Sequence, residues 1–324
     1  MNRRTLLAAG AALVAAPRLA RAQGNWPERP VRVIVPFTPG GTTDILGRAI
    51  AAELQEAFNQ PFVIENRGGA GGTVGSEVVA RATPDGYTLM MGHIGTLAVN
   101  PSLYRNLSFD PATAFAPIGL MAIVPNILVV NPRKVAANNV QELIALAKRR
   151  PGSLTYGSGG NGSAAHTAMV AFCQATGTEM EHIPYRGTGP MMNDLIAGTI
   201  DLTLTGGPAA LPPARSGLVK ALGVSSLRRL SSAQDIPTIA EQGVPGFDAT
   251  QWYGLVTTAG TPRPIIDRLN EAHNRILNGP RLRPRLEAEG ADAAPGTPEE
   301  YRDFIARERA RWGELIRATN MRPD

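Results

Sequence analysis

One local arrangement occurs twice in this 324-residue chain and constrains its fold more than any other feature. Each copy is a short apolar or β-branched run that leads into a glycine-rich turn and then into a segment with helical spacing. The first copy runs from Val31–Phe37 through Thr38–Thr43, and the second from Leu154–Tyr156 through Ser158–Gly162. Helices should follow at once, so the pattern predicts an α/β fold in which strands deliver glycine turns to helix starts.

The rest of the chain also alternates between strand and helix patterns, which predicts largely parallel sheets. The alternation starts afresh near residue 123, so we expect a first lobe of residues 24–122 plus 246–324 and a second lobe of residues 123–245. Two segments would then cross between the lobes, at Phe115–Val130 and Phe247–Thr257. Helices are predicted at Asp44–Phe58, Ser76–Ala82, Val140–Arg149, Ser163–Thr176, Pro190–Ala197, Pro264–Leu277 and Pro298–Thr319.

Residues 1–22 have the three-part layout of a signal peptide. A charged pair, Arg3-Arg4, precedes an apolar run at Thr5–Ala16, and Ala20-Arg21-Ala22 fits a cleavage site. The apolar run is shorter than the roughly 20 residues that span a bilayer. The paired arginines favour a twin-arginine signal, and an ordinary secretory signal is the alternative. We therefore expect an exported protein with the periplasm as its compartment.

Composition excludes several classes of function. The leader holds four arginines and no acidic residue, so without it the formal net charge falls from +5 to +1. A balance near neutrality gives no support for nucleic-acid binding, which needs a clustered basic face. Cys173 is the single cysteine, so no intrachain disulfide is possible. The four histidines are scattered without metal-ligand spacing, so no metal site and no cofactor are expected.

The two glycine turns point to anion binding. Glycines let the backbone approach a ligand closely, and the N–H groups at a helix start favour a negative group. The hydroxyls of Thr38, Thr42, Ser158 and Ser163 would add neutral hydrogen bonds. Two such turns that face each other suit a molecule with an anionic group at each end. The alternative is that each turn is only a tight connection.

Catalytic motifs are weak by comparison. Gly160–Ala165 fits the G-x-G-x-x-A pattern of dinucleotide sites, which is unusual in an exported chain, and no G-x-S-x-G elbow is present. Ser163 and His166 lie three residues apart, so a secreted serine hydrolase is the alternative from another class. We expect no enzyme activity and no catalytic residues.

Some roles stay open. His166 either lines the pocket or packs in the core, and Asp44 either caps a helix or orders the first turn. The pair Trp252-Tyr253 either packs at the hinge or lines the cleft.

Several motifs, in order from about Trp26 to the C-terminus, resemble those of the receptors of tripartite tricarboxylate transporters, the Bug family. They are Val35–Asp44, Glu65–Gly72, Pro84–Leu89, Tyr156–Ser163 with His166, Pro184–Gly187, Asp235–Thr238 and Trp252–Leu255.

This resemblance implies a two-lobed periplasmic-binding-protein fold (Venus flytrap, type II-like) with two crossover segments. It implies capture of a small carboxylate in the interlobe cleft and delivery to integral-membrane permease subunits. Both glycine turns would hold the carboxylate ends. The expected ligand-binding residues are Phe37, Thr38, Gly40, Gly41, Thr42, Asp44, Thr96, Ser158, Gly159, Ser163, His166, Tyr185 and Thr205.

One departure from the family pattern bears on the ligand. The family often shows an acidic residue and then asparagine after the strand that starts near Asp201, whereas this chain has Thr205-Gly206-Gly207. A dicarboxylate or an aromatic carboxylate is therefore favoured over an acidic amino acid. A receptor that signals to a membrane sensor is the alternative to uptake, and we expect a monomer.

Overall fold

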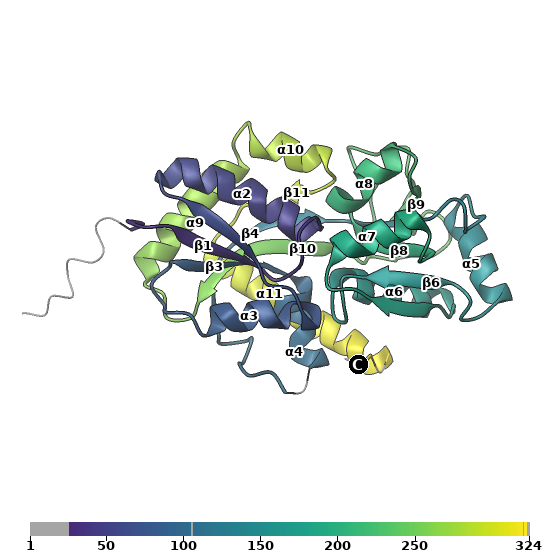
Figure 1. The fold of residues 1–324 in the computed structure, drawn as a ribbon, viewed down its shortest axis with the longest axis horizontal. Coiled ribbons are helices and arrows are strands. Elements are labelled where there is room, and N and C mark those ends of the chain that lie inside the picture. Colours follow the sequence, from purple (N-terminus) through teal and green to yellow (C-terminus); the bar gives the residue numbers. More distant parts are fainter. Residues whose placement is uncertain (1–25, 105, 320, 323–324) are drawn as a thin grey trace, which may run out of the picture.

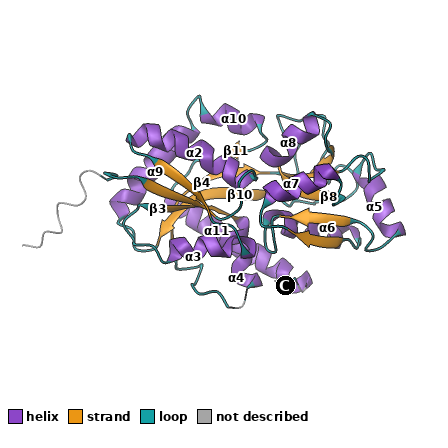
Figure 2. Cartoon of the chain, viewed as in Figure 1, coloured by secondary structure: helices purple, strands orange, loops and turns teal. Residues whose placement is uncertain are grey.

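The computed structural model describes residues 26–104, 106–319 and 321–322. The chain forms two sheets, each flanked by helices, and the two lobes lie end to end (Figure 1, Figure 2). The expected signal peptide at residues 1–22 lies outside the described part of the chain. No helix in that part has both the length and the apolar character needed to cross a membrane.

The first lobe is built on a six-stranded sheet with the order β11-β4-β10-β3-β1-β2. Strand β1 pairs in parallel with β2 and β3, whereas β10 runs antiparallel to β3 and β4. The strands are β1 (Val31–Val35), β2 (Phe62–Asn66), β3 (Thr88–His93), β4 (Phe115–Val124), β10 (Gln251–Thr258) and β11 (Asp292–Ala293).

The second lobe is built on a five-stranded sheet with the order β7-β6-β8-β5-β9. Strand β6 pairs in parallel with β7 and β8, and β5 runs antiparallel to β8 and β9. The strands are β5 (Asn126–Val130), β6 (Thr155–Ser158), β7 (Glu181–Pro184), β8 (Leu202–Gly206) and β9 (Lys220–Val224).

Helices flank both sheets (Figure 2). The first lobe holds α2 (Thr42–Phe58), η2 (Ala70–Gly72), α3 (Thr73–Ala80), η3 (Gly95–Val99), α4 (Asn100–Leu103), α9 (Arg263–Leu277), α10 (Leu282–Ala288) and α11 (Pro298–Thr319). The second lobe holds α5 (Val140–Arg149), α6 (Ala164–Thr176), α7 (Thr188–Ala197) and α8 (Gly207–Arg215).

The central strands of each sheet, such as β1 and β5, are buried on both faces, which explains why they read as continuous apolar runs. In β1, Val33 packs into the cluster under α2, α9 and α10, and the next residue, Ile34, packs into the cluster under α3 and α11. In β5, Leu128 packs with α5 and α6, and its neighbour Val129 packs with α7 and α8. Successive side chains of a strand point to opposite faces, so two apolar neighbours supply two cores.

The lobes are joined within the two predicted crossing segments. The chain leaves the first sheet at Val124 and enters the second at Asn126, with Pro125 between them, and it returns to the first sheet at Gln251. The expectation of largely parallel sheets is wrong, because β10 and β5 each lie antiparallel to both neighbours. A parallel neighbour requires a crossover that returns the chain to the same end of the sheet, whereas β5 and β10 enter their sheets directly from the other lobe.

Two of the differences between the predicted and the observed helices bear on the site. Helix α2 begins at Thr42 with Gly41 as its N-cap, so the interpretation of Asp44 as a helix cap is wrong. Helix α8 was not predicted. It directly follows β8 and contains Pro212 and Pro213, residues that argue against a helix when only the sequence is read.

Candidate functional site

The turn between β1 and α2 is held by the carboxylate of Asp44. Its Oδ2 atom accepts the Gly40 N–H at 3.0 Å, and its Oδ1 atom accepts the Asn66 amide at 2.9 Å. Arg48 donates Nε to the same carboxylate at 3.0 Å, and Asn66 also donates to the Phe37 carbonyl oxygen at 3.0 Å. Asp44 therefore orders the first glycine turn from behind.

These contacts explain the ionisation of Asp44. Burial opposes the charged form, yet the hydrogen bonds from Arg48, Asn66 and the Gly40 amide outweigh it and hold the pKa of Asp44 below its ordinary value. The carboxylate is 4% exposed and stays charged at neutral pH. The carboxylate is therefore hydrogen-bonded to groups of the first turn and its surroundings.

The turn between β6 and α6 is held by two serines. Ser158 Oγ accepts the Gly160 N–H at 3.1 Å and lies 2.7 Å from His182 Nε2. Ser163 is the N-cap of α6, and its Oγ accepts the His166 N–H at 3.4 Å. The second turn is therefore fixed by serine hydroxyls and not by a carboxylate.

Rings stack behind this second turn. The imidazoles of His166 and His182 lie parallel with centroids 4.0 Å apart, and Tyr156 stacks on His182 at 4.9 Å. His166 Nδ1 accepts the Gly162 N–H at 3.2 Å. Burial, and then the neighbouring His182, lower the pKa of His166 to about 3, so the ring is neutral.

The first turns of α2 and α6 meet at one small cavity between the lobes. Its lining residues are Phe37, Thr43, His93, Gly159, Ser163, Ala164, Ala165, Thr188, Thr205, Gln251 and Tyr253. They come from both sheets and both glycine turns, and none has a carboxylate, ammonium or guanidinium group. The first N–H groups of a helix have no intrahelical partner, so Thr43, Ala164 and Ala165 place free donors beside this space.

The structure shows the lobes in contact. The cavity measures about 20 Å³, which holds about one water molecule. Tyr104 donates its hydroxyl to the Asn161 carbonyl oxygen across the lobes at 3.1 Å, and Gly71 packs against the same carbonyl. A larger solute enters this site only if the lobes separate.

His93 forms one wall of the cavity. Its ring stacks on Phe37 with centroids 4.6 Å apart and meets Tyr253 edge-on at 5.8 Å. Its Nδ1 accepts the Gly95 N–H at 2.6 Å, and burial lowers the pKa of His93 to about 4. Burial also raises the pKa of Tyr253 above its ordinary value, so both side chains are neutral.

A hydrogen-bonded chain connects the cavity to the hinge. The Tyr253 hydroxyl donates to Gln251 Oε1, and Gln251 Nε2 donates to Asn126 Oδ1 at 2.5 Å. Asn126 is the first residue of β5, and its amide donates to the Ala249 carbonyl oxygen at 2.6 Å. The cavity wall and the two crossing segments are therefore directly linked.

Four residues of the expected ligand-binding set line the cavity, namely Phe37, Gly159, Ser163 and Thr205. The others lie around it. Thr38 packs against Gly187, and Thr42 lies so close to Gly206 that a methyl group there would stand 2.8 Å from its hydroxyl. These two threonines lie at the contact between the lobes, as do Gly40 and Gly41, which face Gly189 and Thr188.

The remaining expected residues support the walls. Thr96 exchanges hydrogen bonds of 3.1 Å with the His93 backbone through its hydroxyl. Tyr185 donates its hydroxyl to Asp194 at 2.7 Å. Asp44, Ser158 and His166 hold the two glycine turns, as described above.

Seven lining residues were not in the expected set. Thr43, Ala164 and Ala165 adjoin expected residues, so the same motif contained the signal. Of the pair whose role was open, Tyr253 lines the cavity and Trp252 packs between α11 residues. His93, Thr188 and Gln251 carry no local motif that distinguishes them.

The geometry also bears on the hydrolase alternative. Ser163 Oγ contacts the backbone N–H of His166, and the ring nitrogen Nδ1 of His166 is occupied by the Gly162 N–H. The Ser163–His166 pair of that alternative therefore lacks the contact between hydroxyl and ring that nucleophile activation requires.

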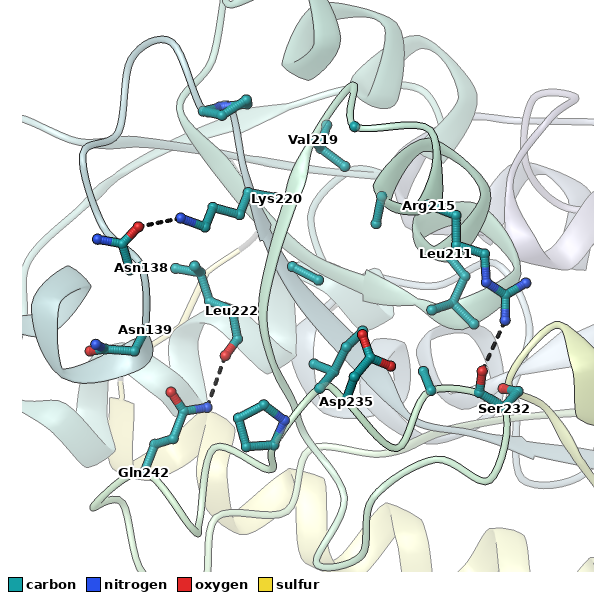
Figure 3. A pocket seen from close by; sticks show the side chains of 17 residues that line it. Asn138, Asn139, Leu211, Arg215, Val219, Lys220, Leu222, Ser232, Asp235 and Gln242 are labelled. Carbon is teal, nitrogen blue, oxygen red and sulfur yellow. Dashed lines mark hydrogen bonds between the residues drawn. The ribbon is translucent and has the colours of Figure 1, made fainter.

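A larger cavity, about 550 Å³, lies at the outer edge of the second sheet, beside β9 (Figure 3). Gln242 donates to the Leu222 carbonyl oxygen at 2.8 Å, and Lys220 donates to Asn138 (Figure 3). All of its lining residues belong to the second sheet and the segments around it, so movement of the lobes does not shape it. We therefore place the candidate ligand site in the interlobe cavity.

Comparison with known proteins agrees with this architecture. Residues 46–321 match the family model described as tripartite tricarboxylate transporter family receptor. The protein BugT of Bordetella pertussis is 36% identical over 322 residues, which cover 98% of each chain.

Solved structures are similar in fold. A Rhodopseudomonas palustris protein solved with adipate is 37% identical, with a TM-score of 0.90 over 92% of this chain and 100% of that one. MatC from the same organism, solved with malate, is 33% identical, with a TM-score of 0.86 over 90% and 100% of the two chains. This chain belongs to the tripartite tricarboxylate transporter receptor family.

Proposed function

We propose that this protein is an exported receptor that binds a small carboxylate between its lobes without changing it chemically and delivers it to a tripartite membrane transporter. The observation that carries the proposal is the convergence of the α2 and α6 helix starts on one neutral interlobe cavity. Helix starts supply N–H donors and a favourable dipole for an anion without any cationic side chain. Relatives solved with adipate and with malate support the same ligand class.

The two-sided arrangement favours a ligand with two carboxylates. Thr43 lies at the start of α2, and Ala164 and Ala165 lie at the start of α6, so each lobe offers one anion-binding helix start. The lining residues include no acid that would pair with a ligand ammonium group. Thr205, where the family often has an acidic residue, offers only a hydroxyl. We infer a plain dicarboxylate, with an aromatic carboxylate as the next choice, over an acidic amino acid.

Three parts of the proposal extend beyond the site. The lobes would be residues 24–122 plus 246–324 and residues 123–245, since the chain changes sheets near both boundaries. Residues 1–22 would direct export to the periplasm, through the twin-arginine pathway. Integral-membrane permease subunits would then take the ligand from a monomeric receptor, with no nucleic acid involved.

Binding is tested by thermal unfolding of the mature protein with adipate, malate, a tricarboxylate and a monocarboxylate. A ligand at 100 times its Kd should add about 2.7 kcal/mol to the free energy of unfolding. We expect a rise in Tm with a dicarboxylate and none with the diamide of adipic acid, which has the same length but no charge. Stabilisation by sugars or metal ions, and by no carboxylate, would contradict the proposal.

A further inference from the structure

Two buried histidines, one in each lobe, make the same contact with a glycine. In the first lobe His93 Nδ1 accepts the N–H of Gly95 at 2.6 Å. In the second lobe His166 Nδ1 accepts the N–H of Gly162 at 3.2 Å. Both imidazoles are at least 94% buried, and each contact lies within a single lobe.

The two glycines meet across the interface between the lobes. A methyl group on Gly95 would stand 2.7 Å from the Gly162 carbonyl oxygen, so the two backbones are in direct contact. Each histidine therefore holds a backbone segment of its own lobe at the point where that lobe touches the other. Gly162 is also the residue before Ser163, which caps α6 and lines the cavity.

This contact requires a neutral imidazole with its proton on Nε2. A protonated ring has donors at both nitrogens, so Nδ1–H would then face the glycine N–H. The groups packed around His93 are Phe37, Tyr253 and Thr96, and none carries a charge. His166 faces His182 and Tyr156, and a second histidine at 4.0 Å further disfavours a positive charge.

We propose that His93 and His166 are positioning residues that hold the Gly95 and Gly162 backbones as neutral Nδ1 acceptors, so that acidification favours separation of the lobes and weakens ligand binding. Separation of the lobes would expose the second turn and the His93 wall to solvent, where imidazole accepts a proton more readily. The predicted effect on ligand affinity rests on the proposed function, whereas the predicted tautomer of each ring is independent of it.

The tautomers are measured directly by long-range ¹H–¹⁵N NMR of the ligand-free protein at pH 7. We expect unprotonated Nδ1 and protonated Nε2 on both His93 and His166, because both contacts are internal to a lobe. A proton on Nδ1 of either ring would overturn the proposal, whatever the ligand is.

The pH linkage is measured by calorimetric titration of adipate at pH 7 and pH 5. A histidine whose pKa is higher in the open form than in the closed form takes up a proton on opening. Each such histidine lowers the affinity for adipate by up to tenfold per pH unit, so the affinity should fall by about tenfold or more from pH 7 to pH 5. Asn Oδ1 accepts a hydrogen bond near the Nδ1 position and does not titrate. The double variant His93→Asn with His166→Asn keeps both acceptors but has no titratable ring at either position. Its affinity for adipate should therefore fall much less between pH 7 and pH 5 than that of the parent, whatever its affinity at pH 7.

Two further variants separate this role from general packing. His93→Phe keeps a stacked ring but no acceptor, so its affinity should fall at both pH values. His273 is equally buried in the first lobe and does not line the cavity, so His273→Asn should keep the parental pH profile.

A double Asn variant with the parental pH profile would overturn the proposal. If the parent does not bind adipate at pH 7, the proposed function loses support while the tautomers still decide the role of the histidines.

Discussion

Gly189 at the start of α7 lies against the Pro39 carbonyl oxygen of the other lobe, closer than any side chain on Gly189 would permit. Gly71 packs in the same way against the Asn161 carbonyl oxygen. The lobes therefore touch through backbone atoms at several glycines. Contacts of this kind exist only in the closed arrangement, and each glycine that makes one is a place to test closure.

Gly189→Ala should weaken ligand binding without lowering stability. The three atoms nearest to the added methyl group belong to Pro39 and Gly40 of the opposite lobe, so the strain arises in the closed form. Alanine in place of glycine in a helix adds up to about 1 kcal/mol of stability. We expect an unchanged or higher Tm of the ligand-free variant and a Kd for the dicarboxylate at least tenfold higher, which is about 1.4 kcal/mol.

Gly296→Ala is the control, because Gly296 lies before α11 and the three atoms nearest to its methyl group would all belong to the Glu300 side chain of the same lobe. It should bind as the parent does. Equal affinity of Gly189→Ala and the parent would show that ligand binding does not need this closed contact.

Thr205→Glu should abolish binding of the dicarboxylate. Thr205 is 3% exposed and lines a cavity without charged side chains, so a carboxylate there repels the bound anion in a medium of low dielectric. Thr205→Gln has the same size and no charge, and it should retain more affinity than the glutamate variant. Isothermal titration decides between them, and equal loss in both variants would assign the effect to bulk.

The fold could be read largely from local patterns. Helix α11 begins and ends where the spacing of apolar residues predicts, at Pro298–Thr319, and α9 begins one residue before its predicted start. Amphipathic helices of this length carry their own periodicity, so tertiary context changes little. The glycine turns before α2 and α6 were also visible, because glycine and hydroxyl residues mark a turn before a helix.

The remaining walls of the cavity depend on pairing that no local pattern reveals. His93 at the end of β3 lies beside Tyr253 of β10 because these two strands pair antiparallel with that register. Gln251 reaches Asn126 across 125 positions of sequence at the hinge. The order and direction of the strands at the crossing segments decide which of these residues become neighbours. Strand order and direction could not be predicted from the sequence alone, as the wrong expectation of largely parallel sheets shows.

Asp44→Asn should lower stability at neutral pH and remove part of its acid dependence. The carboxyl pKa is lower in the folded protein than its ordinary value of 3.8. Its contribution is therefore fully present above that value and is lost as the pH falls through the folded pKa. Because Arg48 is half exposed, we expect a loss of only about 1 kcal/mol at pH 7, and less near pH 2.

Urea unfolding at the two pH values measures this difference for Asp44→Asn, with Asp303→Asn at an exposed site as the control. The variant should also bind the ligand more weakly, because asparagine has one acceptor oxygen where the carboxylate has two, so either the Gly40 amide or the Asn66 side chain loses its acceptor. A stability difference that is the same at pH 7 and pH 2 would refute the electrostatic explanation.

Asn126→Ala should weaken both the fold and ligand binding. Asn126 is 1% exposed and joins the Gln251 side chain to the Ala249 carbonyl oxygen, so its removal leaves two buried polar groups without this partner. Each such group costs about 1–3 kcal/mol. The freed Gln251 amide also lines the cavity and can turn away from the ligand.

The control is Asn278→Ala, which removes one exposed hydrogen bond to the Asn274 carbonyl oxygen and should change neither stability nor affinity. Urea unfolding and calorimetric titration measure the two effects, and a stable Asn126→Ala variant with unchanged affinity would show that the hinge and the cavity are not coupled through Gln251.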